Sequence, residues 1–143
     1  MVRGLPKYAG EVVRQKASSP KLQVFDTALA SVQAGRTFHE VRTDPEAWGR
    51  LVESAAGAHL VNAEAAGTCA VHYWRDRGRE VDFVVTRGGR VTAIEVKSGA
   101  GIGSAAGRDA FHDAHHPDRT LLIGGDGIPL EQFLTTPVEH WLA

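Results

Sequence analysis

The stretch that decides the fold is VHYWRDRGREVDFVVTRGGRVTAIEVK, residues 71–97. It contains three runs rich in β-branched and aromatic residues, at 71–74, 80–86 and 91–97. Short turns containing Gly78 and Gly88-Gly89 separate these runs. Turns this short join neighbouring strands as hairpins, so the three runs are expected to pair as an antiparallel meander.

Charged residues interrupt the apolar pattern of the second and third runs. Asp82 lies in the second run, and Glu95 and Lys97 lie two positions apart in the third. Because side chains alternate between the two faces of a strand, Glu80, Asp82 and Val84 are expected to share one face. If the hairpin register brings Asp82 beside Glu95, repulsion between the carboxylates favours a cation between them.

This pattern is typical of a site for Mg²⁺ or Mn²⁺, which prefer carboxylate, carbonyl and water oxygens. We expect Asp82 and Glu95 to be ligands, and the main-chain carbonyl of Val96 to add another oxygen. Lys97 would then orient the attacking water or neutralise charge that develops on a phosphate. The alternative is a set of cross-strand salt bridges, in which Lys97 pairs with Glu95 or Asp82.

A long helix is predicted at residues 45–66, before the meander. Asp44 suits the N-cap position and Pro45 the first helical position, and apolar residues follow at helical spacing up to Gly67. Glu53 lies in the middle of this helix and would add a third acidic ligand over the strands. The alternative is that Glu53 belongs to a solvated helix face.

Gly57 lies one turn after Glu53. A glycine inside a helix costs about 1 kcal/mol relative to alanine. Its presence is explained if another part of the chain approaches the helix backbone closely at this point.

Further elements are predicted after the meander. A Gly-rich loop at 99–103 leads to Ser104, which would cap a helix at 105–115. The apolar run at 120–123 predicts a fourth strand, parallel to the third because a helix crosses over between them. Pro129 would open a last helix. The fold class is therefore α/β, a three-layer arrangement with a mixed four-stranded sheet flanked by helices.

Residues 1–43 have weaker periodicity and are predicted to form an appendage to a domain at 44–143. An extended segment is expected at 22–25, and Asp26 would cap a short helix that ends near residue 32. Residues 35–43 are expected to be a loop.

The composition narrows the class of protein. The net charge of −1 and the pI near 6.6 provide no overall basic field that would attract nucleic acid. The single cysteine, Cys69, cannot form an internal disulfide, which favours a reducing compartment. No apolar run approaches the roughly 20 residues needed to span a bilayer. A cytoplasmic protein without a membrane partner is the expectation.

Smaller signals have ordinary explanations as well as functional ones. Arginines at the two hairpin turns would contact phosphates or simply be solvated. His112 and His116 lie four apart on a predicted helix, without the glutamate of an H-E-x-x-H zinc motif. Trp74 is expected in the core, and Cys69 has no basic neighbours that would activate a thiol.

The order of these residues resembles the PD-(D/E)XK nuclease superfamily, in which a helix glutamate precedes an aspartate and a Glu-x-Lys pair. More closely, the chain resembles the uncharacterised C-terminal domain of bacterial and archaeal AAA-type ATPases. The segments that carry this resemblance are SSPKLQVFD (18–26), WGRLVESAAGAHL (48–60), YWRDRGREVDFV (73–84), AIEVKSG (93–99) and TLLIGGDGIPL (120–130). The resemblance implies that Glu53, Asp82, Glu95 and Lys97 match active-site positions.

Two functions follow as hypotheses. The first is a Mg²⁺- or Mn²⁺-dependent endonuclease acting on DNA. The second is a non-catalytic module that binds nucleic acid or protein, or regulates an AAA-type ATPase partner. The chain has no G-x-x-x-x-G-K-[ST] phosphate loop, so it is not expected to be an ATPase by itself. The sequence leaves the oligomeric state open.

Overall fold

A computed structural model describes residues 1–9, 18–99 and 105–143. Its centre is a four-stranded mixed sheet in the order β3-β4-β5-β6. The strands are β3 (Ala70–Asp76), β4 (Arg79–Arg87), β5 (Arg90–Val96) and β6 (Arg119–Ile123). The first three strands pair antiparallel, and β6 pairs parallel with β5. The predicted meander and the parallel fourth strand are both confirmed.

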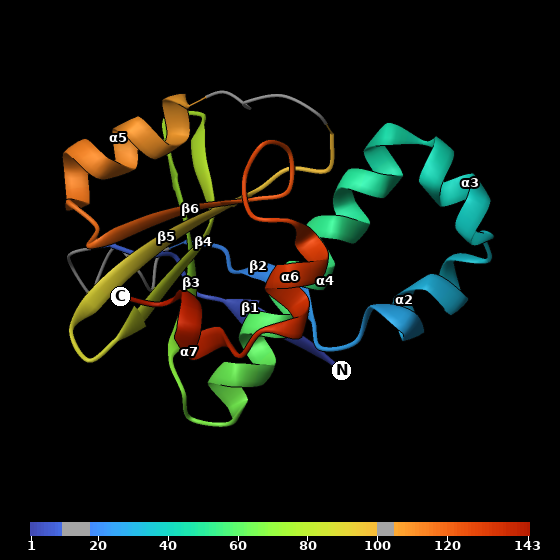
Figure 1. Ribbon diagram of the computed structural model, residues 1–143, viewed down its shortest axis with the longest axis horizontal. Coiled ribbons are helices and arrows are strands. Elements are labelled where there is room, and N and C mark those ends of the chain that lie inside the picture. Colours follow the sequence, from blue (N-terminus) through green and yellow to red (C-terminus); the bar gives the residue numbers. More distant parts are fainter. Residues whose placement is uncertain (10–17, 100–104) are drawn as a thin grey trace.

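Helices cover both faces of this sheet, so the predicted α/β fold class is confirmed (Figure 1). One face carries α4 (Pro45–Ala65), α6 (Leu130–Thr135) and α7 (Val138–Trp141), and the other carries α5 (Ala106–His115). The main core lies on the α4 side, where Leu60, Phe83 and Phe133 are fully buried. A smaller core on the α5 side contains Trp74, Val81, Val84, Ala93 and Phe111.

Helix α4 forms where the sequence predicts it. The Asp44 side chain accepts hydrogen bonds from the N–H groups of Glu46 and Ala47, which otherwise have no partner within the helix. Pro45 occupies the first turn, where no N–H donor is needed. The helix runs across the sheet and carries Glu53 at its middle.

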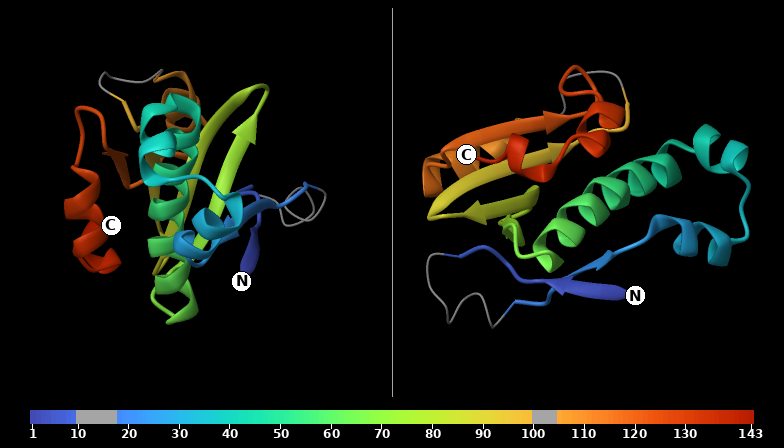
Figure 2. Two further views of the ribbon diagram at one scale, coloured as in Figure 1. Left: turned by 90° about the vertical axis from the view of Figure 1, so that its right-hand side faces the viewer. Right: turned by 60° about the horizontal axis from the view of Figure 1, so that its bottom comes forward.

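The amino-terminal segment forms a two-stranded ribbon and two helices. Strands β1 (Val2–Leu5) and β2 (Lys21–Val24) pair antiparallel. Helix α2 (Thr27–Ala34) begins after Asp26, which caps it as predicted. Helices α2 and α3 (Phe38–Thr43) project away from the sheet beyond the start of α4 (Figure 2). Leu5 is fully buried in the main core, so this segment also contributes to the core; a domain boundary at residue 43 stays a prediction.

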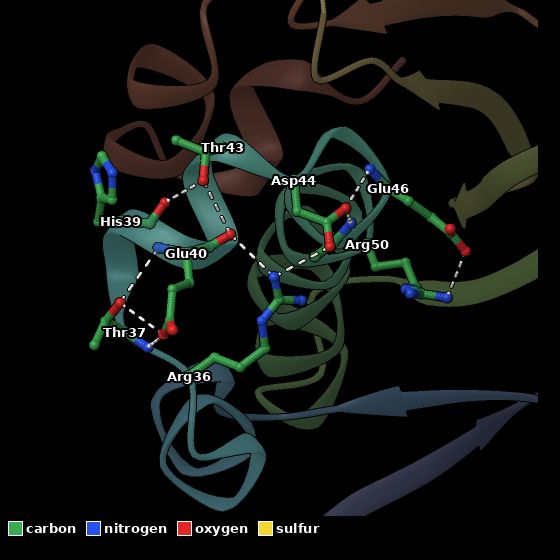
Figure 3. Close-up of polar contacts among 9 residues, drawn as sticks. Arg36, Thr37, His39, Glu40, Thr43, Asp44, Glu46 and Arg50 are labelled. Atoms are coloured by element: carbon green, nitrogen blue, oxygen red, sulfur yellow. Dashed lines mark hydrogen bonds and ion pairs between the residues drawn. The ribbon is translucent and has the colours of Figure 1, made fainter.

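The prediction of a loop at 35–43 is wrong, because α3 lies within it. Thr37 and Glu40 form a capping box, in which the Thr37 hydroxyl accepts from the Glu40 N–H and the Glu40 carboxylate accepts from the Thr37 N–H. The Arg36 guanidinium then joins the carbonyl of Glu40 to the carboxylate of Asp44, as Figure 3 shows. The Thr-x-x-Glu spacing was the signal for this helix.

The predictions for the carboxyl-terminal helices are partly confirmed. Helix α5 ends at His115 as predicted, but the proposed cap, Ser104, and most of the Gly-rich loop lie outside the described residues. Helix α6 begins directly after Pro129, as predicted, but it is not the last helix, because α7 follows it. Within residues 1–9, 18–99 and 105–143, no helix has the length and apolar character required to cross a membrane.

Candidate functional site

Asp82 lies at an irregularity of β4. The register between β3 and β4 shifts by one residue between the pairs His72–Val84 and Trp74–Val81. Two residues of β4, Asp82 and Phe83, therefore oppose one residue of β3, which is the arrangement of a β-bulge. Such a bulge redirects a side chain, and Asp82 lies one residue beyond the end of the β4–β5 ladder at the pair Phe83–Ile94.

The bulge corrects one prediction. Val81 and Val84 both pack in the smaller core, beside Ala93 of β5. Strict alternation would put residues three apart on opposite faces. Val84 instead lies on the same face as Val81, so the prediction that Glu80, Asp82 and Val84 share one face is wrong. The register of β4 with β5 reaches the pair Phe83–Ile94, and one further step brings Asp82 opposite Glu95.

The Asp82 carboxylate is mostly buried and bonds to the end of β5. Its Oδ2 atom accepts a hydrogen bond from the Val96 N–H at 2.8 Å. Burial raises the pKa of Asp82 to about 6, and the nearby negative charge of Glu53 acts in the same direction. The Val96 hydrogen bond and the charges of Lys21 and Lys97 oppose this rise of the pKa. Asp82 is therefore a carboxylate whose negative charge is incompletely compensated.

Glu95 is the most buried acidic residue of the site, with 6% of its surface exposed. Its Oε1 atom lies 2.8 Å from Lys97 Nζ, and its Oε2 atom lies 2.9 Å from Arg108 Nε. The second contact is an ion pair by distance, but neither atom has a hydrogen-bond partner of good geometry. Glu95 Oε2 is thus held by the charge of Arg108 and not by a hydrogen bond of good geometry.

Helix α5 approaches β4 closely enough to deliver Arg108 to Glu95. A β-carbon on the preceding residue, Gly107, would overlap the carbonyl oxygen of Glu80. A glycine is therefore required at this contact, since any side chain would push the helix away from the strand.

Glu53 reaches the site from α4, where its carboxylate pairs with Lys21 of β2 at 2.5 Å. Lys21 also lies 3.6 Å from the Glu80 carboxylate and donates to the carbonyl of Asp82 at 3.3 Å. The prediction that the α4 backbone is closely approached near Glu53 is confirmed at Gly57, where a β-carbon would overlap the Gln23 side chain.

All four predicted site residues line one pocket of about 310 Å³. Its lining consists of Glu53, Gly78, Arg79, Glu80, Asp82, Glu95, Lys97, Ala106 and Gly107. Side chains from α4, β4 and the end of β5 thus converge beside the first residues of α5. Val96 lies next to Asp82 and contacts it through its N–H; the expectation that its carbonyl binds metal stays a prediction.

The carboxylates of Glu53 and Glu95 are held by cations in this conformation. Within residues 1–9, 18–99 and 105–143, no group of three or more His, Cys, Asp or Glu side chains is arranged to hold a metal ion. Lys21 contacts Glu53, while Lys97 and Arg108 contact Glu95. The salt bridge between Lys97 and Glu95, which the sequence offered as an alternative, is therefore present.

Sequence reasoning missed three residues of this site, namely Lys21, Arg108 and the ion-paired Glu80. No local sequence pattern points to Lys21, and its role becomes clear only from the packing of β2. On β2, Gln23 is buried and Leu22 is 74% exposed, so the strand turns its polar residues inward. Lys21 and Gln23 alternate with Leu22, and a polar inward face of this kind marks a contact with other polar groups.

The smaller signals mostly take their ordinary explanations. Trp74 is 4% exposed and belongs to the smaller core. Burial raises the pKa of Cys69 to about 11, which agrees with an unreactive thiol. Arg75 pairs with Glu80, and Arg79 lies 4.0 Å from Asp76.

Comparison with known protein families matches residues 48–133 to a family described as a domain of unknown function, DUF4143. The match covers more than half of the chain and includes Glu53, Asp82, Glu95 and Lys97. It begins after β2, so Lys21 lies outside it. Neither a curated protein nor a solved structure gives a significant match.

Proposed function

The chain belongs to the DUF4143 family, and we propose that its polar pocket catalyses metal-dependent hydrolysis of phosphodiester bonds in DNA. One observation carries the proposal: Glu53, Asp82, Glu95 and Lys97, which come from three separate parts of the chain, line the same pocket. Three carboxylates and a lysine beside the positive end of helix α5 provide ligands for a hard cation and positive charge for a phosphate.

The donors suit Mg²⁺ or Mn²⁺ in kind. Asp82 and Glu95 are both carboxylates. Burial raises the pKa of Asp82 to about 6, so a nearby cation would favour its ionised form, and Glu95 Oε2 lacks a hydrogen-bond donor of good geometry. We infer that these two residues hold the metal, with Glu53 and the carbonyl of Val96 as further ligands. Because Lys21 and Lys97 pair with Glu53 and Glu95, metal binding requires these carboxylates to exchange partners.

Each residue then has a definite part. A bound divalent cation would lower the pKa of water and stabilise charge on the phosphate. Asp82, which lines the pocket, is held in place by the Val96 N–H. Once the ion pair between Lys97 and Glu95 is broken, the Lys97 ammonium is free to hold the attacking water or a phosphate oxygen. Arg108, at 2.9 Å from Glu95, holds the buried carboxylate in its orientation.

The finer family assignment is part of the proposal. The order helix-Glu53, Asp82, Glu95-x-Lys97 on a mixed sheet flanked by helices supports a PD-(D/E)XK-like domain. By the same resemblance, we propose DNA as the substrate and an AAA-type ATPase as the partner protein.

Plasmid cleavage tests this function. Purified wild type is expected to nick supercoiled DNA with Mg²⁺ or Mn²⁺ and not with EDTA. Asp82→Asn and Lys97→Met should each lower the rate at least about a hundredfold, in line with typical losses of electrostatic and acid–base groups. Arg50→Met changes an exposed residue paired only with Glu46 among the described contacts and should leave the rate unchanged. Equal rates in all four proteins would indicate a contaminating nuclease and contradict the proposal.

A second function is favoured by the ion pairs themselves. Lys21, Lys97 and Arg108 neutralise the acidic residues of the pocket, as expected if the cluster serves the fold of a non-catalytic module. That module would bind protein or nucleic acid, or regulate an ATPase. Calorimetric titration with Mn²⁺ distinguishes the two functions, because only the nuclease requires binding that Asp82→Asn abolishes.

A further inference from the structure

Strand β2 places a lysine ammonium among the oxygens of the candidate site. Lys21 Nζ lies 2.5 Å from Glu53 Oε1, 3.6 Å from Glu80 Oε1 and 3.3 Å from the carbonyl oxygen of Asp82. It also lies 5.0 Å from the centre of the Phe83 ring. Carboxylate and carbonyl oxygens around one positive charge are the surroundings that a hard metal cation also prefers.

The position of Lys21 is built into the packing of β2. Gln23, two residues later on the same face, is 4% exposed and donates to the carbonyl of Ser54 at 2.9 Å. The contact forms because Gly57 leaves room for the Gln23 side chain against α4. The side chain of Lys21 is 19% exposed, so its ammonium is largely enclosed.

Lys21 also comes from outside the segment that matches the family, residues 48–133. The amino-terminal ribbon therefore supplies a charge to a site whose other members belong to the matched domain. The position of the ribbon therefore determines whether the positive charge of Lys21 lies beside the carboxylates of the matched domain.

We propose that the Lys21 ammonium is an internal cation that competes with the divalent metal for Glu53 and the neighbouring oxygens. The inference rests on the proposed function, because it assumes that the pocket binds a metal. Metal binding displaces Lys21 and loosens β2, and docking of β2 in turn weakens metal binding, since coupling between two binding events is reciprocal. The amino-terminal ribbon is thus an inhibitory element of the site.

The test measures Mn²⁺ affinity by calorimetry for the full chain and two variants. Lys21→Met retains the aliphatic stem and removes the charge. Arg79→Met removes a charge from the same pocket, but Arg79 lies nearest Asp76 among the acidic groups described, at 4.0 Å. We expect Lys21→Met to bind Mn²⁺ at least about fivefold more tightly than wild type, as is typical of coupled sites, and Arg79→Met to gain clearly less.

A second measurement tests whether Mn²⁺ displaces Lys21, or whether the Lys21 charge only lowers Mn²⁺ affinity at a distance. Hydrogen exchange of the wild-type amides at residues 21–24 should accelerate when Mn²⁺ is added, because β2 loses the Lys21–Glu53 contact with α4. This measurement needs no substitution, so it decides the proposal even if Lys21→Met fails to fold.

The outcomes distinguish the inference from the proposed function. Mn²⁺ binding with equal affinity in wild type and Lys21→Met, or unchanged exchange of β2 at saturating Mn²⁺, overturns the role of Lys21 and leaves the metal site standing. Absence of Mn²⁺ binding in both wild type and Lys21→Met overturns the proposed metal-dependent function, and the role of Lys21 with it.

Discussion

The Asp82 carboxylate accepts a hydrogen bond from the main-chain N–H of Val96, with 2.8 Å between Oδ2 and nitrogen. This bond joins the bulged part of β4 to the end of β5, just beyond the pair Phe83–Ile94. It holds Asp82 beside Glu95 and inside the pocket. A carboxylate buried there lowers the free energy of unfolding at neutral pH, because burial disfavours its ionised form.

Asp82→Asn is expected to stabilise the protein at neutral pH. Burial raises the pKa of Asp82 from 3.8 to about 6, so the folded state binds the proton more strongly than the unfolded chain does. The free energy of unfolding of wild type therefore falls as pH rises from about 4 to about 6. Asparagine stays neutral and can still accept from Val96, so the variant should gain on the order of 2 kcal/mol above pH 6 and little near pH 4.

Urea denaturation at about pH 4 and about pH 7.5 checks this pH dependence. Asp126→Asn, at an exposed position, is the matched control and should change the unfolding free energy little at either pH. A loss of stability in Asp82→Asn at the higher pH would mean that the ionised carboxylate makes a net favourable contribution, contrary to our account.

Gly57→Ala should destabilise the protein although alanine is the better helix former. The new β-carbon would overlap Gln23 Oε1 and lie 2.7 Å from Phe83 Cζ. We expect a loss of about 1–3 kcal/mol from overpacking. Gly49→Ala, in the same helix, meets only Ser98 Oγ at 3.3 Å and should be neutral or stabilising by up to about 1 kcal/mol. Thermal denaturation of both variants makes the comparison, and equal changes would argue against close packing of β2 on α4.

Arg108→Met should lower stability by leaving Glu95 with one cationic partner. The lost ion pair joins the Arg108 side chain, which is 19% exposed, to the Glu95 side chain, which is 8% exposed. Removing one partner of a buried ion pair is usually worth about 3–5 kcal/mol, and because Lys97 remains we expect about 1–3 kcal/mol. Arg50→Met breaks an exposed pair and should change stability by less than about 0.5 kcal/mol. Similar effects of the two substitutions in chemical denaturation would contradict the buried role of Arg108.

Local sequence signals were sufficient for most of the fold. Asp44 and Pro45 mark the start of α4, and the Gly-containing turns fix the meander because short loops permit only adjacent antiparallel strands. Helix α3 was missed although Thr37 and Glu40 carry the capping-box spacing.

The candidate site was only partly predictable. The convergence of Asp82 with Glu95 follows from the hairpin register, whereas the bulge at Asp82 does not, because alternation of two faces assumes an unbroken strand. The cationic residues of the site were even harder to predict from the sequence. Lys21 and Arg108 reach the carboxylates through long-range packing of β2 and α5, and no local pattern specifies such contacts.

The most direct test of the metal site is anomalous X-ray diffraction from crystals soaked in Mn²⁺. Our account predicts a manganese peak in the pocket, in contact with Asp82 and Glu95, with the Lys21 side chain withdrawn from Glu53. A pocket without a manganese peak at saturating Mn²⁺, with Lys21 still paired to Glu53, would contradict it.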